Sequence, residues 1–316
     1  RHDGSVAWNI FVGNSSALLA AYLPADSARA IYADPRAVVA WGPPNACRLR
    51  AAPGGYRVSG RWDFASGCRQ ATWMGAHALV VEADGSVRLN AAGKPTVRSV
   101  LFPVAQAELL DTWHTIGLRG TASDSYTVDD VFVPEAFSAT REDPALRRES
   151  GRLYAFTQGG LYAVGVAGVA CGLAGAMLDA FIALARDKTP RGIGRLGDNA
   201  VVQANVGRMR ARLDSARAWL VETLTSIWAA AGSEAPIDVP DRARVRLACA
   251  HATHTAEAVA DFAYKAAGVD AIFLGTVFER RFRDVHTLSQ QIQARTAHYE
   301  TVGQVMLGLE PVGGFL

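Results

Sequence analysis

The apolar positions of this chain follow two different periods. Between residues 35 and 137, short runs alternate apolar and polar side chains among many glycines and prolines, which is typical of half-buried strands. Several short strands within about a hundred residues predict a β-sandwich or barrel. The strands expected from the alternation are 37–41, 56–59, 76–82, 98–102 and 125–132, with a hairpin turn at Asp84-Gly85.

Helical periods occupy the rest of the chain. Asp3 predicts the start of a helix whose apolar positions reach Leu19 with a break at residues 13–16, and Pro24 starts a short helix ending near Tyr32. A polar linker follows the strands at 138–151. Four long helices joined by loops then predict a bundle. They are expected at 154–185, 199–231, 241–267 (capped by Asp241) and 277–307.

The fold class is therefore α+β, mainly α. We expect a helical segment at 1–34, a β domain at 35–137 and a four-helix bundle at 152–316. The helix at 154–185 is apolar on most faces and rich in glycine, which is typical of a helix buried among others. A membrane span is the alternative interpretation of that helix.

Composition narrows the class of protein. With 316 residues, half of them apolar, the chain can bury a large core, and a net charge of +2 argues against a dedicated nucleic-acid binder. The four cysteines are far apart and lack metal-type spacing, so we expect reduced thiols and a cytoplasmic protein without a signal peptide. His251 and His254 share a helix face at i, i+3, but no carboxylate or cysteine completes a metal set, so we expect packing roles for both and no metal site.

The most informative stretch is GGYRVSGRWDFASG, residues 54–67. Its glycines predict turns, and its alternation predicts a hairpin or bulged corner that brings Trp62, Phe64 and Ser66 to one spot. An aromatic wall beside a hydroxyl suits a flat, apolar ligand that also forms hydrogen bonds. The alternative is an ordinary hairpin whose aromatic side chains lie in the core.

This stretch resembles the flavin-facing segment of the acyl-CoA dehydrogenase superfamily, in its branch of two-component flavin monooxygenases. Two further blocks agree with the resemblance. WHTIGLRGTASD, residues 113–124, is similar to the family's W-x-x-x-G-L-R-G-T-x-S block, and RDVHTLSQQ, residues 283–291, is similar to its C-terminal R-D helix. The resemblance implies that N-terminal helices of that fold precede Arg1.

The resemblance implies one of two reactions at a flavin held where the β domain meets the bundle. A dehydrogenase needs a carboxylate base to remove a proton from carbon. Neither residues 285–299 nor residues 154–171 contain Asp or Glu, which disfavours dehydrogenation. The monooxygenase branch instead uses reduced flavin and O₂, through a flavin hydroperoxide, to oxygenate a small aromatic or hydrophobic substrate. Two alternatives remain: a dehydrogenase-like enzyme with a relocated base at Glu257 or Asp261, and a catalytically silent binding subunit.

The same resemblance implies roles for individual residues. Ser66 would bond the flavin edge, while Trp62 and Phe64 would wall its ring beside Gly67. Arg119 and Ser123 would contact the flavin phosphate and ring. His286 would donate to the peroxide or deprotonate a phenol, and Gln291, where several relatives carry a histidine, would donate a hydrogen bond. Arg283 and Asp284 are expected to form a structural ion pair.

The sequence lacks the motifs that would bind a nicotinamide cofactor, and this predicts a partner protein. No G-x-G-x-x-G or P-loop motif is present, so we expect a separate NAD(P)H:flavin reductase to supply reduced FMN, with FAD as the alternative. The resemblance also implies a homotetramer.

Overall fold

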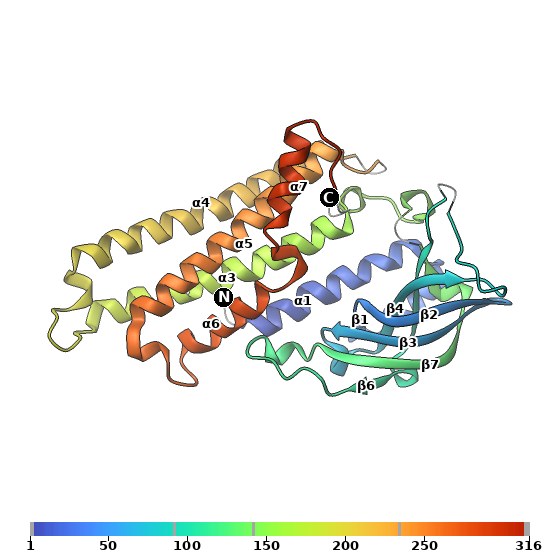
Figure 1. Ribbon diagram of the computed structural model, residues 1–316, viewed down its shortest axis with the longest axis horizontal. Helices are drawn as coiled ribbons and strands as arrows, with labels where there is room; N and C mark the ends of the chain where they lie inside the picture. The colour runs from blue at the N-terminus through green and yellow to red at the C-terminus, as the bar shows by residue number, and fades with distance from the viewer. Residues whose placement is uncertain (1–2, 91–92, 141–142, 233–234, 313–316) are drawn as a thin grey trace. The chain divides into compact units, whose positions relative to one another are not determined.

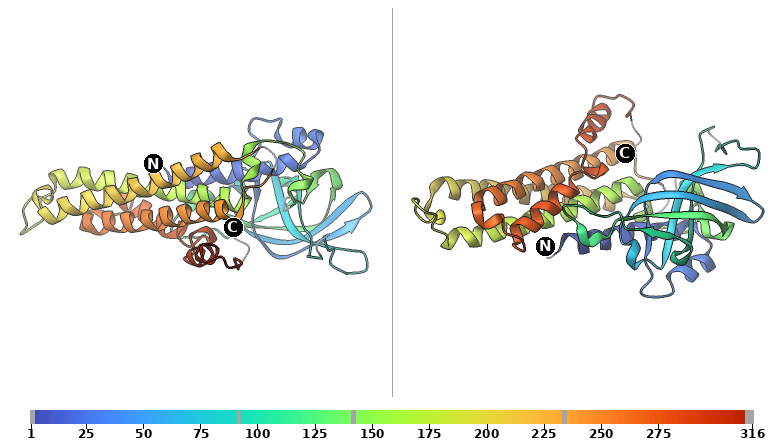
Figure 2. Two further views of the ribbon diagram at one scale, coloured as in Figure 1. Left: turned by 90° about the horizontal axis from the view of Figure 1, so that it is seen from above. Right: turned by 60° about the horizontal axis from the view of Figure 1, so that its bottom comes forward.

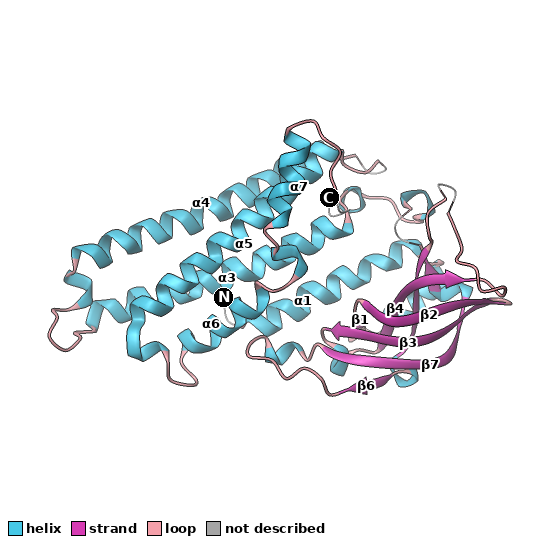
Figure 3. Ribbon diagram, viewed as in Figure 1, coloured by secondary structure: helices cyan, strands magenta, loops and turns pink. Residues whose placement is uncertain are grey.

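The protein is built from two compact units. The computed structural model describes residues 3–90, 93–140, 143–232 and 235–312 (Figure 1). One unit is helical and the other contains the β-sheet (Figure 3). The helical unit comprises Arg1–Trp8, Thr115–Leu118 and Gly151–Leu316, and the β unit comprises Asn9–His114 and Arg119–Ser150. The expected linker at 138–151 falls almost wholly in the β unit, and residues 141–142 of it lie outside the described residues.

The β unit contains one mixed sheet. Its strands are β1 (Val39–Trp41), β2 (Pro44–Ala52), β3 (Gly55–Ala65), β4 (Trp73–Val81), β5 (Val97–Pro103), β6 (Glu108–Leu110), β7 (Asp124–Pro134) and β8 (Ser138–Ala139). The strand order is β6-β7-β3-β2-β4-β5-β8, and β1 pairs in parallel with β4. Each of the five expected strands overlaps an observed one. The sequence analysis missed β2, β6 and β8.

The sheet folds over on itself around an apolar core. The indole Nε1 of Trp62 on β3 donates to the carbonyl of His77 on β4 at 3.1 Å. The hydroxyl of Tyr126 on β7 donates to the carbonyl of Gly75, which also lies on β4. Neither β3 nor β7 is paired with β4, so these side chains cross the interior. Inward-facing residues of β2, β3, β4, β5 and β7 complete the core, as expected for a sandwich or barrel.

The N-terminal helices are α1 (Gly4–Ala17) and α2 (Ala25–Tyr32). The expected break at residues 13–16 is wrong, because α1 continues through Gly13 to Ala17. Leu19, Leu23 and Ile31 cover the sheet through Val39, Leu101 and Ala139, so this part of the chain packs with the β unit.

The helical unit is built around three long helices: α3 (Gln158–Asp187), α4 (Ala200–Ala230) and α5 (Val239–Ala267). They run side by side in Figures 1 and 2, and α5 packs against both of the others. The N-cap of α5 is Asp238, which accepts from the backbone N–H of Asp241 at 2.8 Å, so the expected cap at Asp241 is corrected by one turn.

The expected fourth helix is two helices, α6 (Val277–Leu288) and α7 (Ala297–Met306). The interruption follows from Gln291, whose extended backbone (ψ 145°) stops the helical ladder and whose side chain accepts from the N–H of Gln293 at 2.6 Å. A short 3₁₀ turn, Ile292–Ala294, follows before α7 begins. Among the described residues, only α3 is long and apolar enough to span a membrane, and 61% of its most apolar window is buried, as in a core helix.

Candidate functional site

The aromatic residues of the central motif separate in the structure. Trp62 lies in the core of the β unit, where its ring stacks on Tyr126 with centroids 5.3 Å apart. Its Nε1–H is bonded to the carbonyl of His77. The expectation that Trp62 walls a flavin ring is therefore corrected, since this indole has no surface to offer a ligand.

Phe64, two residues later, points outward. Its side chain is 62% exposed, and its φ of +59° is rare for a residue with a Cβ. This left-handed residue reverses the strand alternation, and the β3–β7 pairing shifts register between Trp62 and Ala65. The Phe64 ring meets the edge of Trp113 at 6.2 Å and an interplanar angle of 87°. An exposed aromatic surface thus stands at the end of β3.

A chain of hydroxyl groups lies at the same strand end. Ser66 Oγ and Ser123 Oγ are 2.7 Å apart, and Ser123 Oγ is also 2.7 Å from Thr121 Oγ1. The N–H of Gly67, whose φ is +79°, donates to the carbonyl of Thr121 at 2.8 Å. The structure therefore brings together the two motif blocks that resemble the flavin-binding family, through Ser66, Gly67 and Ser123.

Backbone strain is concentrated in these motif blocks. Among the described residues, four other than glycine have positive φ, and three of them are Phe64, Leu118 and Ala122. Such conformations each cost about 1–3 kcal/mol and persist where surrounding contacts enforce them, most often at functional sites.

A buried carboxylate organises the second motif block. Asp124 accepts from the N–H groups of Thr112 and Trp113 at 3.0 and 2.9 Å, and from Arg69 Nε at 2.5 Å. Burial alone would raise the pKa of Asp124, but the hydrogen bonds from Arg69, Trp113 and Thr112 outweigh it and lower that pKa. Asp124 thereby fixes the backbone of Trp113, the residue that supports Phe64. The sequence analysis missed this role, although Asp124 ends the motif quoted for the family.

Asn9 lies beside this cluster. Its Nδ2 donates to the carbonyl of Gly120 at 3.4 Å, while its Oδ1 is buried without a hydrogen-bond partner among the described residues. A Cβ on Gly67 would lie 3.7 Å from that oxygen. Arg119, in the adjacent 3₁₀ turn Arg119–Thr121, is exposed.

These groups fit a flavin. An isoalloxazine edge carries both N–H donors and carbonyl acceptors, so an orphaned acceptor, two serine hydroxyls and an exposed aromatic face match its chemistry.

The histidine of the R-D helix is held by carboxylates. His286 Nε2 lies 2.9 Å from Asp261 Oδ1, and Nδ1 lies 3.7 Å from Glu257 Oε1. The imidazole also packs on Phe282, with centroids 4.2 Å apart. In this arrangement both ring nitrogens face acidic side chains of α5. The two residues that could serve as a relocated base are the same two that hold His286.

Arg283 and Asp284 act separately, which corrects the expectation of an ion pair between them. Arg283 pairs with Glu279 at 2.7 Å and donates to the carbonyl of Ile116. Asp284 is buried and accepts from the N–H of Leu118 at 2.6 Å. Burial raises the pKa of Asp284. Both residues therefore fasten the segment Thr115–Leu118 onto α6.

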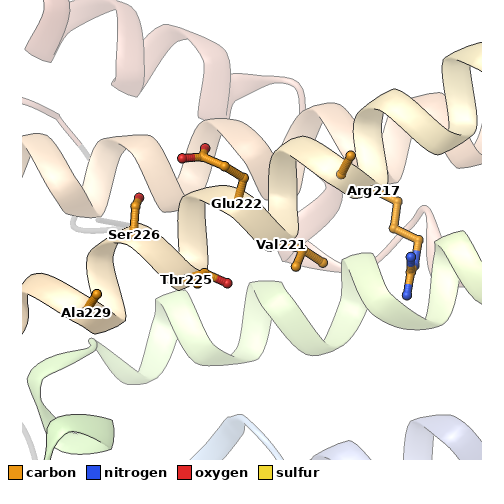
Figure 4. A pocket seen from close by; sticks show the side chains of 7 residues that line it. Arg217, Val221, Glu222, Thr225, Ser226 and Ala229 are labelled. Carbon is orange, nitrogen blue, oxygen red and sulfur yellow. The ribbon is translucent and has the colours of Figure 1, made fainter.

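The remaining candidates make local contacts. The Gln291 side chain caps its own 3₁₀ turn, as described above. His254 bonds the carbonyl of Ala294 through Nε2 at 2.7 Å, and the His251 ring packs edge-on against Trp219 at 5.4 Å. The surface hollow drawn in Figure 4 contains none of the expected site residues. It is lined by α4 alone, through Arg217, Ala218, Val221, Glu222, Thr225, Ser226 and Ala229.

Comparison with known proteins places the chain in a family. Residues 164–295 match the model of the acyl-CoA dehydrogenase C-terminal domain. Indole-3-acetate monooxygenase of Pseudomonas putida is 31% identical over 99% of this chain and 78% of its own length. The oxygenase component of the FADH₂-dependent resorcinol hydroxylase of Rhizobium sp. is 30% identical over 84% of this chain and 67% of its own length.

A solved structure agrees with these relatives. The structure of XiaF from Streptomyces sp., in complex with FADH₂ and glycerol, superposes with a TM-score of 0.87 at 25% identity, over 99% of this chain and 80% of that one. The chain belongs to the acyl-CoA dehydrogenase superfamily, in its branch of oxygenase components of two-component flavin-dependent monooxygenases.

Proposed function

We propose that this protein receives reduced flavin from a separate NAD(P)H:flavin reductase and oxygenates a small aromatic substrate. The observation that carries the proposal is the joining of the two flavin-type motif blocks by the Ser66–Ser123 hydroxyl pair beside the exposed ring of Phe64. A bound reduced flavin would supply two electrons to O₂; one oxygen atom would enter the substrate and the other would leave as water.

The chain's own residues have distinct tasks in this proposal. The Phe64 ring offers an apolar surface to the flavin and keeps water from it, which a reactive oxygen species requires. Ser66, backed by Ser123, donates to the flavin edge, and Asn9 Oδ1 accepts from it. Arg119 is exposed and suits a flavin phosphate. Gln291 and His286 would line the substrate end.

Proton abstraction from carbon is the reaction that these residues suit least. The acidic side chains of α5 that could act as a base, Glu257 and Asp261, are both committed to His286. A carboxylate oxygen that contacts an imidazole nitrogen is less available to a substrate C–H bond, which a general base must reach directly. This pairing favours oxygenation over an acyl-CoA dehydrogenase activity.

The names of the relatives sharpen the choice of flavin and leave the substrate open. Both the resorcinol hydroxylase and the XiaF structure carry FADH₂ in their names, so we propose that reduced FAD is accepted, beside the reduced FMN expected from the sequence. One relative is named for indole-3-acetate, an aromatic acid, and another for resorcinol, a neutral phenol. We further propose a cytoplasmic homotetramer, which sedimentation velocity would test.

The test is isotopic. The protein is mixed with chemically reduced FAD or FMN and ¹⁸O₂ in the presence of candidate aromatics, and the product is analysed by mass spectrometry. One ¹⁸O atom per product molecule supports an oxygenase. A protein that binds no flavin in either redox state refutes the proposal and favours a binding subunit, whereas bleaching of bound oxidised FAD by an acyl-CoA favours a dehydrogenase.

A further inference from the structure

A positive charge is buried in the helical unit with no counter-charge among the described residues of that unit. Arg246, on α5, is only 1% exposed. Its Nη1 donates to the side-chain oxygen of Gln293, a neutral amide. Its Nε and Nη2 are buried and have no hydrogen-bond partner among the described residues, and no carboxylate of those residues lies within ion-pair distance of it.

Such an arrangement is costly for the protein on its own. A buried charge requires a partner, and each unmatched donor loses its hydrogen bonds to water. Burial lowers the pKa of Arg246, yet guanidinium remains a cation at neutral pH. Aliphatic side chains and small residues dominate the buried face of α5, so an apolar side chain would be the simpler choice at this position.

The free edge of this guanidinium faces the start of a helix. A Cβ on Gly159 would lie 3.5 Å from Arg246 Nη2. Apart from the neighbouring residues and the nearby backbone of the same helix, no other described atom would lie within 4 Å of it. Gly159 belongs to the first turn of α3, which contains no acidic residue and is capped by Thr157. The N-terminus of a helix carries partial positive charge, so two positive groups converge here.

The contacts also connect this cation to Gln291. Gln293, which accepts from Arg246, donates its own backbone N–H to the side chain of Gln291 at 2.6 Å. The unmatched charge is thus one side chain away from a residue expected at the substrate end.

We propose that Arg246 and the N-terminus of α3 bind the carboxylate of an aromatic acid, which makes the substrate an arylacetate-type acid rather than a neutral phenol. Nε and Nη2 form one edge of the guanidinium fork, and this edge matches two carboxylate oxygens through parallel N–H···O bonds. Gly159 has no side chain to place against this edge. This inference rests on the proposed oxygenase function and names its substrate class.

The experiment uses ligand pairs that differ only in the carboxylate: indole-3-acetate with 3-methylindole, and 4-hydroxyphenylacetate with 4-methylphenol. Dissociation constants are measured by anaerobic calorimetry on protein loaded with reduced flavin, and KM is measured by product formation. Arg246→Gln should weaken binding of each acid by about 100-fold, as truncating one partner of a buried charge pair does, and leave each neutral analogue within about threefold. Arg246→Lys should restore part of the loss.

The matched control is Arg244→Gln on the same helix. Arg244 is exposed and pairs with Asp241 at 2.8 Å, so both members of each pair should bind as in the unmodified protein. Equal weakening of acid and neutral analogue by Arg246→Gln, or no weakening of either, overturns the proposal. Should that variant fail to fold, the unmodified protein still decides, because an acid that binds no tighter than its neutral analogue refutes the carboxylate site.

A separate arm distinguishes the flavin phosphate as the source of the anion. Reduced FMN is compared with reduced riboflavin, which lacks the phosphate, in the unmodified protein and in Arg246→Gln. Loss of the preference for FMN in the variant, with the acid pairs unaffected, assigns Arg246 to the phosphate and overturns the proposal. Failure to incorporate ¹⁸O into any aromatic refutes the oxygenase function instead, and the dissociation constants remain a separate measurement of the carboxylate site.

Discussion

Two substitutions of Asp124 should show how much its hydrogen bonds and its negative charge each contribute to the free energy of unfolding. The side chain is 1% exposed, and a single oxygen, Oδ1, accepts both backbone N–H groups, while Oδ2 accepts from Arg69. Asp124→Ala leaves two N–H groups without an acceptor, at about 1–3 kcal/mol each, so we expect the free energy of unfolding to fall by about 3–5 kcal/mol.

Asp124→Asn should be milder. The amide oxygen can occupy the position of Oδ1 and keep both backbone bonds, but the amide NH₂ then meets the Arg69 donor. We expect a loss of about 1–2 kcal/mol. Asp111→Asn is the matched control, because Asp111 is the other carboxylate partner of Arg69 and is 71% exposed, so its loss should be below about 0.5 kcal/mol.

The assay is urea unfolding followed by tryptophan fluorescence and circular dichroism at several pH values. The lowered pKa of Asp124 means that its ionised form stabilises the folded state above the unfolded pKa and that this contribution disappears as the pH falls through the folded pKa. Asp124→Asn should therefore lose less stability than the unmodified protein under acid conditions. Equal losses for Ala and Asn at position 124, or a loss at Asp111 as large as either, would refute this account of the motif.

Three further outcomes are expected. Mixing protein, reduced flavin and O₂ in a stopped-flow instrument should give a transient near-ultraviolet absorbance, and Ser66→Ala should shorten its lifetime by about fivefold, because one neutral hydrogen bond is worth about 1 kcal/mol. Ser59→Ala, which removes a hydroxyl bonded to the N–H of Asp130, is the control and should leave the lifetime unchanged. Phe64→Gly relieves the positive φ and should raise the free energy of unfolding by up to about 1 kcal/mol while weakening flavin binding in a fluorescence titration; weaker folding would contradict the strain argument. Burial raises the pKa of Asp284, so its protonated form stabilises the folded state. This contribution is complete below the unfolded pKa and is lost as the pH rises through the folded pKa. Asp284→Asn should remove this pH-dependent loss of stability, as measured by urea unfolding at several pH values.

The sequence predicted the fold well where periodicity is a consequence of burial. The apolar runs of β4 and β5 are buried over consecutive residues, on both faces of the strands. The buried residues of α4, from Leu213 to Ile227, follow a helical period. The sequence failed where a single local contact overrides the pattern. The sequence Ser-Gln-Gln-Ile-Gln after α6 contains no residue that predicts a helix end, so the cap formed by the Gln291 side chain could not be predicted.

The site shows the same limit. A strict period of two puts Trp62 and Phe64 on one face, but the positive φ of Phe64 separates them without a glycine to signal it. The pairing of Ser66 with Ser123 joins positions 57 residues apart, and only the family resemblance, not the pattern of either segment, connects them. Arg246 is one of three arginines in the first turns of α5, and nothing in the sequence distinguishes it from the exposed Arg244.

The segment Thr115–Leu118 belongs to the helical unit, and this has a consequence for how the protein folds during synthesis. These four residues interrupt the β unit in the sequence, yet two of them make hydrogen bonds near the far end of the chain: the carbonyl of Ile116 accepts from Arg283, and the N–H of Leu118 donates to Asp284. Leu118 holds an unfavourable φ of +49°, and its backbone N–H donates to Asp284 in this late contact. During synthesis, the loop carrying the second motif must therefore remain unfinished until α6 has left the ribosome. A fragment that stops after β8 would lack that clamp, so the sheet-containing half should not be expected to work as an excised domain.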